Sequence, residues 1–312
     1  MHVLEIRRLT KKFGDVHAVD QLSLSVREGE IFGLLGPNGA GKSTTILMIA
    51  SLLPMTDGEI RIFGRNIAEH PKFAKQQIGL VPQDLAIYEE MTAYENVAFF
   101  AGLYGLRGKE LRSRAEEALA FVGLEDKRNR YAKTFSGGMK RRLNIACAIA
   151  HRPKLIILDE PTVGIDPHSR QSILSAVRRL NEAGSTVLYT SHYMEEVESH
   201  CTRIAVMDHG KVIAEGTLPQ LTSVVTDRRE IVVTLRETDR VKEDALLDIP
   251  GVRTVVRDDH RLLIETDAEV NNLNAVIRAL TASGVEIADI GTRRPNLETV
   301  FLSLTGRSLR DD

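Results

Sequence analysis

Residues 36–44 read GPNGAGKST, which has the composition and spacing of a loop that binds phosphate groups. Glycines let the backbone bend so that successive N–H groups point inward at phosphate oxygens, and the N-terminus of a following helix adds positive potential. Lys42 can then reach the β- and γ-phosphates of a nucleotide, and the Ser43 hydroxyl can bind Mg²⁺. The residues expected to contact the nucleotide are Gly36, Asn38, Gly39, Ala40, Gly41, Lys42, Ser43 and Thr44.

A glycine-rich turn before a surface lysine is the simpler alternative for this stretch. The residues before it, IFGLL at 31–35, form a short apolar run typical of a strand buried on both faces. A helical pattern follows the loop and continues to about residue 53. This order of strand, loop and helix is the context that a phosphate-binding loop requires, so the sequence favours a nucleotide site.

Residues 155–160, LIILDE, place two carboxylates directly after another apolar run. If the run is a buried parallel strand, Asp159 at its end lies beside the phosphate loop, where its carboxylate can hold Mg²⁺. Glu160 is one residue further and points elsewhere, so it can act as a general base toward a water molecule. The alternative is a pair of carboxylates on a turn before Pro161, which the nearby phosphate loop makes less favourable.

The overall composition limits the classes of protein to which the chain can belong. A formal net charge of −2 over 312 residues gives no bias toward nucleic acid, and the two cysteines form no CxxC pair, which favours a reducing compartment. No apolar run approaches the roughly 20 residues that a membrane span needs, and the N-terminus lacks the apolar segment of a signal peptide. We therefore expect a soluble chain, for which another protein supplies any membrane spans.

The remaining pattern predicts an α/β domain followed by a smaller α+β domain. Alternating apolar residues near the N-terminus indicate an antiparallel edge, and apolar runs separated by helices indicate a parallel sheet. We expect the first domain at residues 1–225, with a helical subdomain at about 84–151. A linker is expected at 226–230 and a second domain at 231–312. The element order of the second domain, β-α-β-β-α-β, is ferredoxin-like, and a last helix is expected at about 296–304.

Residues 135–142, FSGGMKRR, place two glycines at the start of a helical pattern, although glycine is a poor helix former. Together with GPNGAGKST, Gln83, LIILDEPTVGIDP and His192, this stretch resembles the ATP-binding subunits of ABC transporters, whose motifs occur in the same order. The resemblance covers about residues 3–222. The stretch FSGGM and the tail PNLETVFLSLTG are similar to those of drug-resistance-type export ATPases. The resemblance implies a P-loop ABC ATPase fold, with a mixed sheet core, an antiparallel β edge and a helical subdomain.

The resemblance also implies roles for residues outside the phosphate loop. Phe13 matches the position of an aromatic ring that stacks on adenine, and the alternative is a core phenylalanine after the first strand. Gln83 matches a glutamine that reaches Mg²⁺ or the attacking water and responds to the membrane partner. Asp166 matches an aspartate that meets the opposite subunit. His192 matches a histidine that holds Glu160 and the γ-phosphate in place.

The same resemblance explains why two glycines stand at the start of this helical pattern. Ser136, Gly137 and Gly138 match a sequence whose serine hydroxyl and bare backbone amides, at a helix N-terminus, hold the γ-phosphate of an ATP bound to a different subunit. Each ATP would thus bridge two chains. The expected catalytic residues are Glu160, His192 and Gln83, and the expected Mg²⁺ ligands are Ser43, Gln83 and Asp159.

The resemblance implies an ATP-hydrolysing subunit of an export system, with ATP and Mg²⁺ as cofactors. We expect a homodimer that drives a separate membrane-spanning permease from the cytoplasmic face of the membrane, exporting a drug, a lipid or a similar compound. One alternative is a soluble ABC ATPase that acts on ribosomes or DNA, but only one set of motifs is present and no long coiled coil interrupts it. The other alternative is an importer ATPase, whose C-terminal extension tends to be larger and richer in β-structure. The second domain is expected to be regulatory or to stabilise the dimer.

Overall fold

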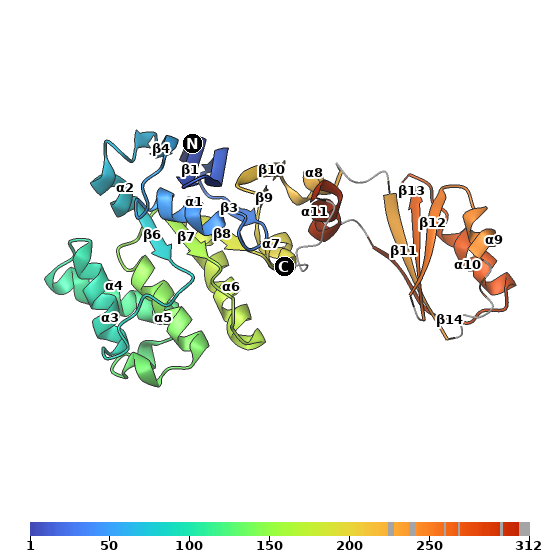
Figure 1. Ribbon diagram of the computed structural model, residues 1–312. Coiled ribbons are helices and arrows are strands. Elements are labelled where there is room, and N and C mark those ends of the chain that lie inside the picture. Colours follow the sequence, from blue (N-terminus) through green and yellow to red (C-terminus); the bar gives the residue numbers. More distant parts are fainter. Residues whose placement is uncertain are drawn as a thin grey trace. The chain divides into compact units, whose positions relative to one another are not determined.

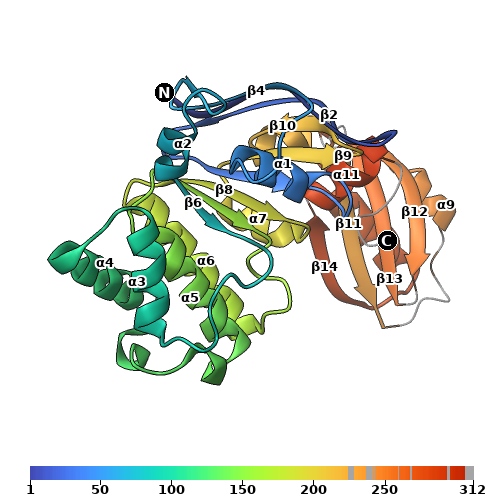
Figure 2. The same ribbon diagram turned by 60° about the vertical axis from the view of Figure 1, so that its left-hand side comes forward.

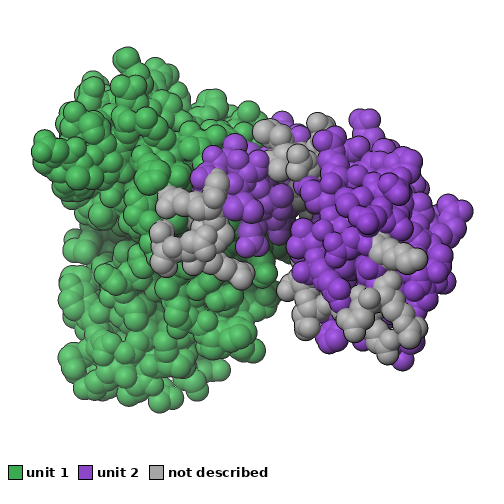
Figure 3. Space-filling view, turned by 45° about the vertical axis from the view of Figure 1, so that its right-hand side comes forward, with its two compact units in different colours: residues 1–217, 312 green, residues 218–311 purple. Residues whose placement is uncertain are grey.

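The computed structural model describes all residues except 224–227, 237–240, 242, 259, 268, 294, 295 and 306–312. The chain divides into two compact units, residues 1–217 and 218–311, which Figure 3 colours separately. The division lies before residue 225, the boundary predicted from the sequence. The reason is helix α8 (Leu218–Ser223), which packs against helix α11 (Leu297–Thr305) of the second unit.

The first unit is built on a six-stranded mixed sheet with the strand order β10-β9-β3-β8-β7-β6 (Figure 1). Five neighbouring strands are parallel, and β10 is antiparallel to β9. The strands are β3 (Ile31–Leu35), β6 (Ile78–Val81), β7 (Leu155–Asp159), β8 (Thr186–Ser191), β9 (Arg203–Asp208) and β10 (Lys211–Gly216). Every residue of β3, β7 and β8 is buried, which explains why β3 and the first four residues of β7 form continuous apolar runs rather than alternating ones.

An antiparallel sheet with the order β2-β1-β4-β5 covers one side of this core, as the sequence predicts. Its strands are β1 (His2–Phe13), β2 (Val16–Arg27), β4 (Asp57–Ile62) and β5 (Arg65–Asn66). Its alternating apolar residues form one hydrophobic core with residues of the parallel sheet, such as Phe32 and Leu34. Helices α1 (Lys42–Ile49) and α2 (Pro71–Gln77) belong to the same part of the unit.

Helices gather at the β6 side of the sheet (Figures 1 and 2). They are α3 (Ala93–Leu103), α4 (Gly108–Phe121) and α5 (Gly137–Ile149), with the 3₁₀ turns η1 (Glu125–Lys127) and η2 (Ala132–Thr134). Thr92 and Glu95 cap α3 reciprocally, because each side chain accepts a hydrogen bond from the backbone N–H of the other. Two further helices, α6 (Pro167–Glu182) and α7 (Met194–His200), follow β7 and β8.

The second unit has the predicted ferredoxin-like arrangement. Its elements are β11 (Arg228–Leu235), α9 (Glu243–Leu247), β12 (Val252–Asp258), β13 (Arg261–Asp267), α10 (Leu273–Ala282) and β14 (Ile287–Arg293), followed by α11. The strands form an antiparallel sheet with the order β12-β13-β11-β14. The predicted linker at 226–230 is wrong for residues 228–230, which pair with β13, while 226 and 227 lie outside the described residues.

Candidate active site

The phosphate loop follows β3, and its glycines are required by close packing as well as by backbone conformation. A Cβ atom at Gly36 would lie 2.3 Å from the carbonyl oxygen of Met207. Gly41 precedes α1 with a φ of 99°, and a Cβ atom there would lie 2.3 Å from the carbonyl oxygen of Ala18. Side chains at either position would displace the backbone of a neighbouring strand or loop. The loop is therefore held against β2 and β9 with its N–H groups at the start of α1.

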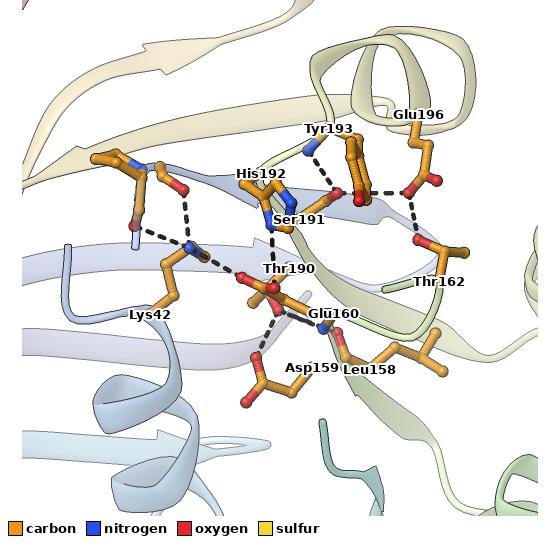
Figure 4. A network of polar contacts seen from close by, with 12 residues as sticks. Lys42, Leu158, Asp159, Glu160, Thr162, Thr190, Ser191, His192, Tyr193 and Glu196 are labelled. Atoms are coloured by element: carbon orange, nitrogen blue, oxygen red, sulfur yellow. Dashed lines mark hydrogen bonds and ion pairs between the residues drawn. The ribbon is translucent and has the colours of Figure 1, made fainter. Parts of the chain in front are cut away.

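Lys42, the first residue of α1, extends back into this loop (Figure 4). Its ammonium group donates hydrogen bonds to the carbonyl oxygens of Gly36, at 2.8 Å, and Pro37, at 3.0 Å. It also forms an ion pair with Glu160, with 3.1 Å between Nζ and Oε1. Both side chains of the pair are about 95% buried, since Lys42 is 4% and Glu160 is 5% exposed. The loop thus holds a desolvated positive charge, as the binding of phosphate requires.

Glu160 follows β7 and occupies a left-handed backbone conformation, with a φ of 45°. Such a conformation costs a residue with a side chain about 1–3 kcal/mol and is concentrated at functional sites. The hydroxyl of Thr190 stabilises it by accepting a hydrogen bond of 3.0 Å from the Glu160 N–H. The second carboxylate oxygen lies 3.1 Å from Nδ1 of His192 (Figure 4). Glu160 is therefore fixed between a lysine on one side and a histidine on the other.

Asp159 is the last residue of β7 and is also buried. Burial raises the pKa of its carboxyl group, while hydrogen bonds from Thr190 and Ser43 oppose this shift. The Thr190 hydroxyl donates to Asp159 Oδ1 at 2.7 Å. A carboxylate next to a serine hydroxyl, both beside the phosphate loop, is a set of hard oxygen donors that fits Mg²⁺. Of the three residues predicted as metal ligands, Ser43 and Asp159 therefore lie together.

Gln83 lies two residues beyond β6, whose Val81 pairs with Leu158 of β7. This register puts Gln83 near the carboxyl end of β7, where Glu160 also lies. The Gln83 side chain is exposed and makes no hydrogen bond within the described part of the chain. Its carbonyl oxygen accepts a hydrogen bond of 2.7 Å from Nη2 of Arg141. Gln83 thus lies at the same edge of the sheet as Glu160, but its amide group makes no hydrogen bond with the carboxylates.

The glycine pair of FSGGM has two different reasons, one for each glycine. Ser136 caps α5, and its hydroxyl accepts a hydrogen bond of 3.3 Å from the Met139 N–H. At Gly138 a Cβ atom would lie 2.1 Å from the Ser169 hydroxyl, so this glycine is needed for the packing of α5 against α6. At Gly137 nothing lies within 4 Å of such an atom. Gly137 therefore leaves the start of α5 open on a side that the described residues of the chain do not fill.

Ser136, Gly137 and Gly138 are not joined to Lys42 or Glu160 by any hydrogen bond or ion pair in the described part of the molecule. Two further residues predicted for the site, Asp166 and Phe13, lie at the surface. Asp166 caps α6, and hydrogen bonds from Ser169 lower the pKa of its carboxyl group.

Phe13, at the end of β1, is 52% exposed, which excludes the alternative that it is a core residue. The ammonium group of Lys11 lies 5.0 Å from the centroid of its ring. One side of the ring thus has a cationic neighbour, and the residue is accessible at the surface of the antiparallel sheet.

Sequence reasoning missed Glu196, a buried carboxylate on α7 that links several parts of the site (Figure 4). Its Oε2 accepts hydrogen bonds from Thr162 at 2.8 Å, from Tyr189 at 2.6 Å and from Ser191 at 3.4 Å. Its Oε1 lies 3.4 Å from the guanidinium Nε of Arg170 on α6. Burial, together with the charge of Glu196, raises the pKa of Tyr189. No local pattern identifies it, because the donors to its carboxylate, Thr162, Tyr189 and Ser191, lie on other parts of the chain.

No helix in the described part of the chain combines the length and apolar character needed to cross a membrane. The sequence matches two family profiles, one described as "ABC transporter" over residues 19–163 and one described as "ATP-binding protein DrrA1-3-like, C-terminal domain" over residues 222–305. These two matches correspond to the two parts of the chain, an ATPase unit and a ferredoxin-like unit.

Three known proteins illustrate the similarity. The linearmycin resistance ATP-binding protein LnrL of Bacillus subtilis (strain 168) is 44% identical, over 99% of this chain and 100% of that protein. The daunorubicin/doxorubicin resistance ATP-binding protein DrrA of Streptomyces peucetius is 39% identical, over 99% and 94%. A solved dimer of the ATP-binding cassette MJ0796 in a post-hydrolysis state, bound to ADP and Pi, is similar with a TM-score of 0.62 and 31% identity, over 69% of this chain and 98% of that one. The chain belongs to the ABC transporter ATPases, in the group that contains the drug-resistance ATP-binding proteins.

Proposed function

We propose that two copies of this chain bind two ATP molecules head to tail, with each triphosphate held by the phosphate loop of one copy and by the start of α5 of the other. The main supporting observation is the open side of Gly137 at a capped helix N-terminus, which no hydrogen bond or ion pair joins to Lys42 among the described residues. A helix N-terminus with bare amides favours an anion. Because no hydrogen bond or ion pair joins this helix end to Lys42 in the described part of the same chain, we infer that a second copy supplies the helix end to the nucleotide.

Within each site, the residues of one chain bind the nucleotide, orient the attacking water molecule and accept its proton. Lys42 exchanges its contact with Glu160 for phosphate oxygens when a triphosphate enters the loop. Asp159 and Ser43 would hold Mg²⁺, which would supply positive charge beside the phosphate groups. Glu160 orients a water molecule and accepts its proton, while His192 fixes the carboxylate by its contact with Oε2. Phe13 stacks on the adenine ring from the surface of the antiparallel sheet.

A membrane-spanning partner is supported by an exposed apolar surface near Gln83. Leu85, Tyr88, Phe99 and Leu103, on α3 and the segment before it, are all substantially exposed, and Leu103 reaches 68%. The rings of Tyr88 and Phe99 meet edge to face, with 5.1 Å between their centroids. Exposed apolar groups of this kind mark surfaces for protein partners. We propose that a cytoplasmic helix of a separate permease packs here, so that the chain works peripherally at the cytoplasmic face of the membrane.

Export of a drug, lipid or similar compound is favoured over import and over action on ribosomes or DNA. The near-full-length similarity to drug-resistance ATP-binding proteins, including the C-terminal profile, supports this choice. The ferredoxin-like unit is proposed to be regulatory or to stabilise the dimer. Its described residues supply no phosphate loop, so the ATP chemistry is assigned to the first unit alone.

Complementation between two inactive variants tests the shared site. Lys42→Ala removes the phosphate lysine, and Gly137→Glu places a carboxylate where the partner's γ-phosphate is expected. Each variant alone should have almost no ATPase activity. In an equimolar mixture, half of the dimers contain both variants, and one of their two sites combines the intact Lys42 of one chain with the intact Gly137 of the other. Recovery of ATPase activity in the mixture supports the proposal, and a mixture as inactive as its components contradicts it.

A further inference from the structure

Helix α5 carries two consecutive arginines, Arg141 and Arg142, that are bound in the same manner to different parts of the molecule. Arg141 donates from Nη1 to the carbonyl oxygen of Pro82, at 2.9 Å, and from Nη2 to that of Gln83, at 2.7 Å. Arg142 donates from Nη1 to the carbonyl oxygens of Val122, at 3.0 Å, and Gly123, at 3.4 Å. The first arginine therefore reaches the segment after β6, whereas the second stays within the helical part of the unit.

The environment of Arg141 is not one in which an arginine would contribute much to the stability of the fold. Its side chain is buried, with 5% exposed, and its Nε has no hydrogen-bond partner among the residues that the structure describes. The acceptors it does have are neutral carbonyl groups, and burial lowers the pKa of the guanidinium group although the charge of Asp84 opposes the shift. A buried cation with incomplete partners is often less stabilising than an apolar side chain of similar volume. We therefore infer that these two hydrogen bonds serve to fix the position of the backbone rather than to stabilise the fold.

The position that they fix is the backbone at Gln83. A guanidinium fork that bonds two successive carbonyl groups defines both the location and the orientation of the peptide between them. Lys140 adds a second attachment, since its ammonium group lies 2.5 Å from a carboxylate oxygen of Glu89 further along the same segment. The segment after β6 is thus tied to α5 at two places.

The same helix is capped by Ser136, only five residues before Arg141. An α-helix is rigid over such a length, which is less than two turns. Any shift of α5 therefore moves the phosphate-binding end of the helix and the Gln83 backbone together.

We propose that Arg141 is a positioning residue that locks the Gln83 backbone to α5, so that Gln83, whose side-chain amide would turn toward Mg²⁺ when nucleotide is bound, and the helix end that faces the γ-phosphate of the other site move as one body. The proposal rests on the two-site function proposed above. Arg141 touches neither nucleotide nor metal and acts through Gln83. Its loss should therefore weaken the use of Mg²⁺ while leaving the binding of ATP at the phosphate loop intact.

The experiment compares Arg141→Gln with the matched control Arg142→Gln in the purified full-length chain. Each substitution removes one guanidinium group from two backbone carbonyls, and both arginines have a buried Nε without a partner. Two quantities are measured: the Mg²⁺ concentration for half-maximal ATP hydrolysis at saturating ATP, and the affinity for ATP without Mg²⁺. We expect Arg141→Gln to raise the Mg²⁺ requirement about tenfold and to change the metal-free affinity less than twofold. Arg142→Gln should leave both quantities within twofold of the unmodified chain.

A double-mutant cycle with Gln83→Ala separates positioning from general damage. If Arg141 acts through Gln83, the chain carrying both Gln83→Ala and Arg141→Gln needs no more Mg²⁺ than the chain carrying Gln83→Ala alone. Additive effects, an unchanged Mg²⁺ requirement in Arg141→Gln, or an equal rise in Arg142→Gln would each overturn the proposal.

Arg141→Lys keeps the charge but cannot bond both carbonyls with one planar fork. It replaces Arg141→Gln if that variant does not fold, and a Mg²⁺ requirement equal to that of the unmodified chain then overturns the proposal. The shared-site function can fail separately, because an absence of complementation between Lys42→Ala and Gly137→Glu leaves the Mg²⁺ comparison unaffected.

Discussion

Alanine substitutions at the two adjacent glycines of α5 should separate stability from activity. At Gly138 the added methyl group would lie 2.1 Å from Oγ and 2.4 Å from Cβ of Ser169, so α5 and α6 must move apart. Overpacking of this kind costs about 1–3 kcal/mol, against a gain of at most about 1 kcal/mol from replacing glycine in a helix. At Gly137 the methyl group meets no described atom within 4 Å, so only the stabilisation from replacing glycine in a helix remains.

The assay is thermal unfolding of the nucleotide-free chain together with ATP hydrolysis. For a unit of this size, 1 kcal/mol corresponds to about 2–4 °C in Tm. Gly138→Ala should lower Tm by a few degrees, whereas Gly137→Ala should keep or slightly raise it. Gly137→Glu should also be stable, because a carboxylate in the first turn of a helix is favourable.

The activities should follow a different order from the stabilities. Gly137→Glu should lose nearly all ATPase activity despite its stable fold, because its carboxylate occupies the place proposed for a phosphate group of the partner's ATP. Gly137→Ala should lose part of the activity, since the methyl group increases the distance of approach. The reasoning is refuted if Gly137→Ala destabilises the chain as much as Gly138→Ala does, or if Gly137→Glu hydrolyses ATP at the normal rate.

Three further substitutions test other contacts. Phe13→Ala should weaken ATP binding by about 1–3 kcal/mol, the range for loss of an aromatic ring stacked on a base. Stability should change little, because the ring is half exposed. Titration with ATP measures the binding, with Phe13→Tyr as the control. Tyr189→Phe removes a buried donor to the Glu196 carboxylate and should lower the free energy of unfolding by about 1.5–3 kcal/mol in urea titrations. Burial raises the pKa of Asp159 above 3.8, so ionisation of this group makes the folded chain less stable as the pH rises through the raised value. Asp159→Asn should therefore raise Tm without nucleotide at pH 7, by an amount that shrinks as the pH falls toward 3.8; a gain independent of pH would contradict this assignment.

Features that depend on neighbouring residues in the chain could be predicted from the sequence. The order of strand, glycine-rich loop and helix around Lys42 is local, and the reciprocal cap of Thr92 and Glu95 lies within one helical turn. The ferredoxin-like order of the second unit also followed from successive apolar patterns. Short elements were missed, because α2, β5, β10 and α8 contain too few residues to show a period.

Features that depend on distant residues could not be predicted. The need for glycine at position 138 comes from Ser169 on another helix, and the partner of Arg141 lies 58 residues earlier in the chain. No pattern within FSGGMKRR distinguishes Gly137 from Gly138, or Arg141 from Arg142. The left-handed backbone of Glu160 was equally hidden, since it depends on the hydroxyl of Thr190 on the neighbouring strand.

The ion pair between Lys42 and Glu160 suggests why hydrolysis should need two chains. In the single chain, Lys42 neutralises a buried carboxylate at 3.1 Å. A triphosphate that takes over Lys42 leaves Glu160 next to further negative charge, and two like charges 4 Å apart repel by about 4 kcal/mol at an effective dielectric constant of 20. Donors from the α5 end of a second copy would offset this repulsion at the γ-phosphate. Glu160→Gln removes the repulsion together with the proton acceptor, so this variant should hydrolyse ATP very slowly and accumulate as an ATP-dependent dimer in gel filtration. If it remains monomeric at ATP concentrations far above its affinity, closure is not driven by the balance of charge around Lys42.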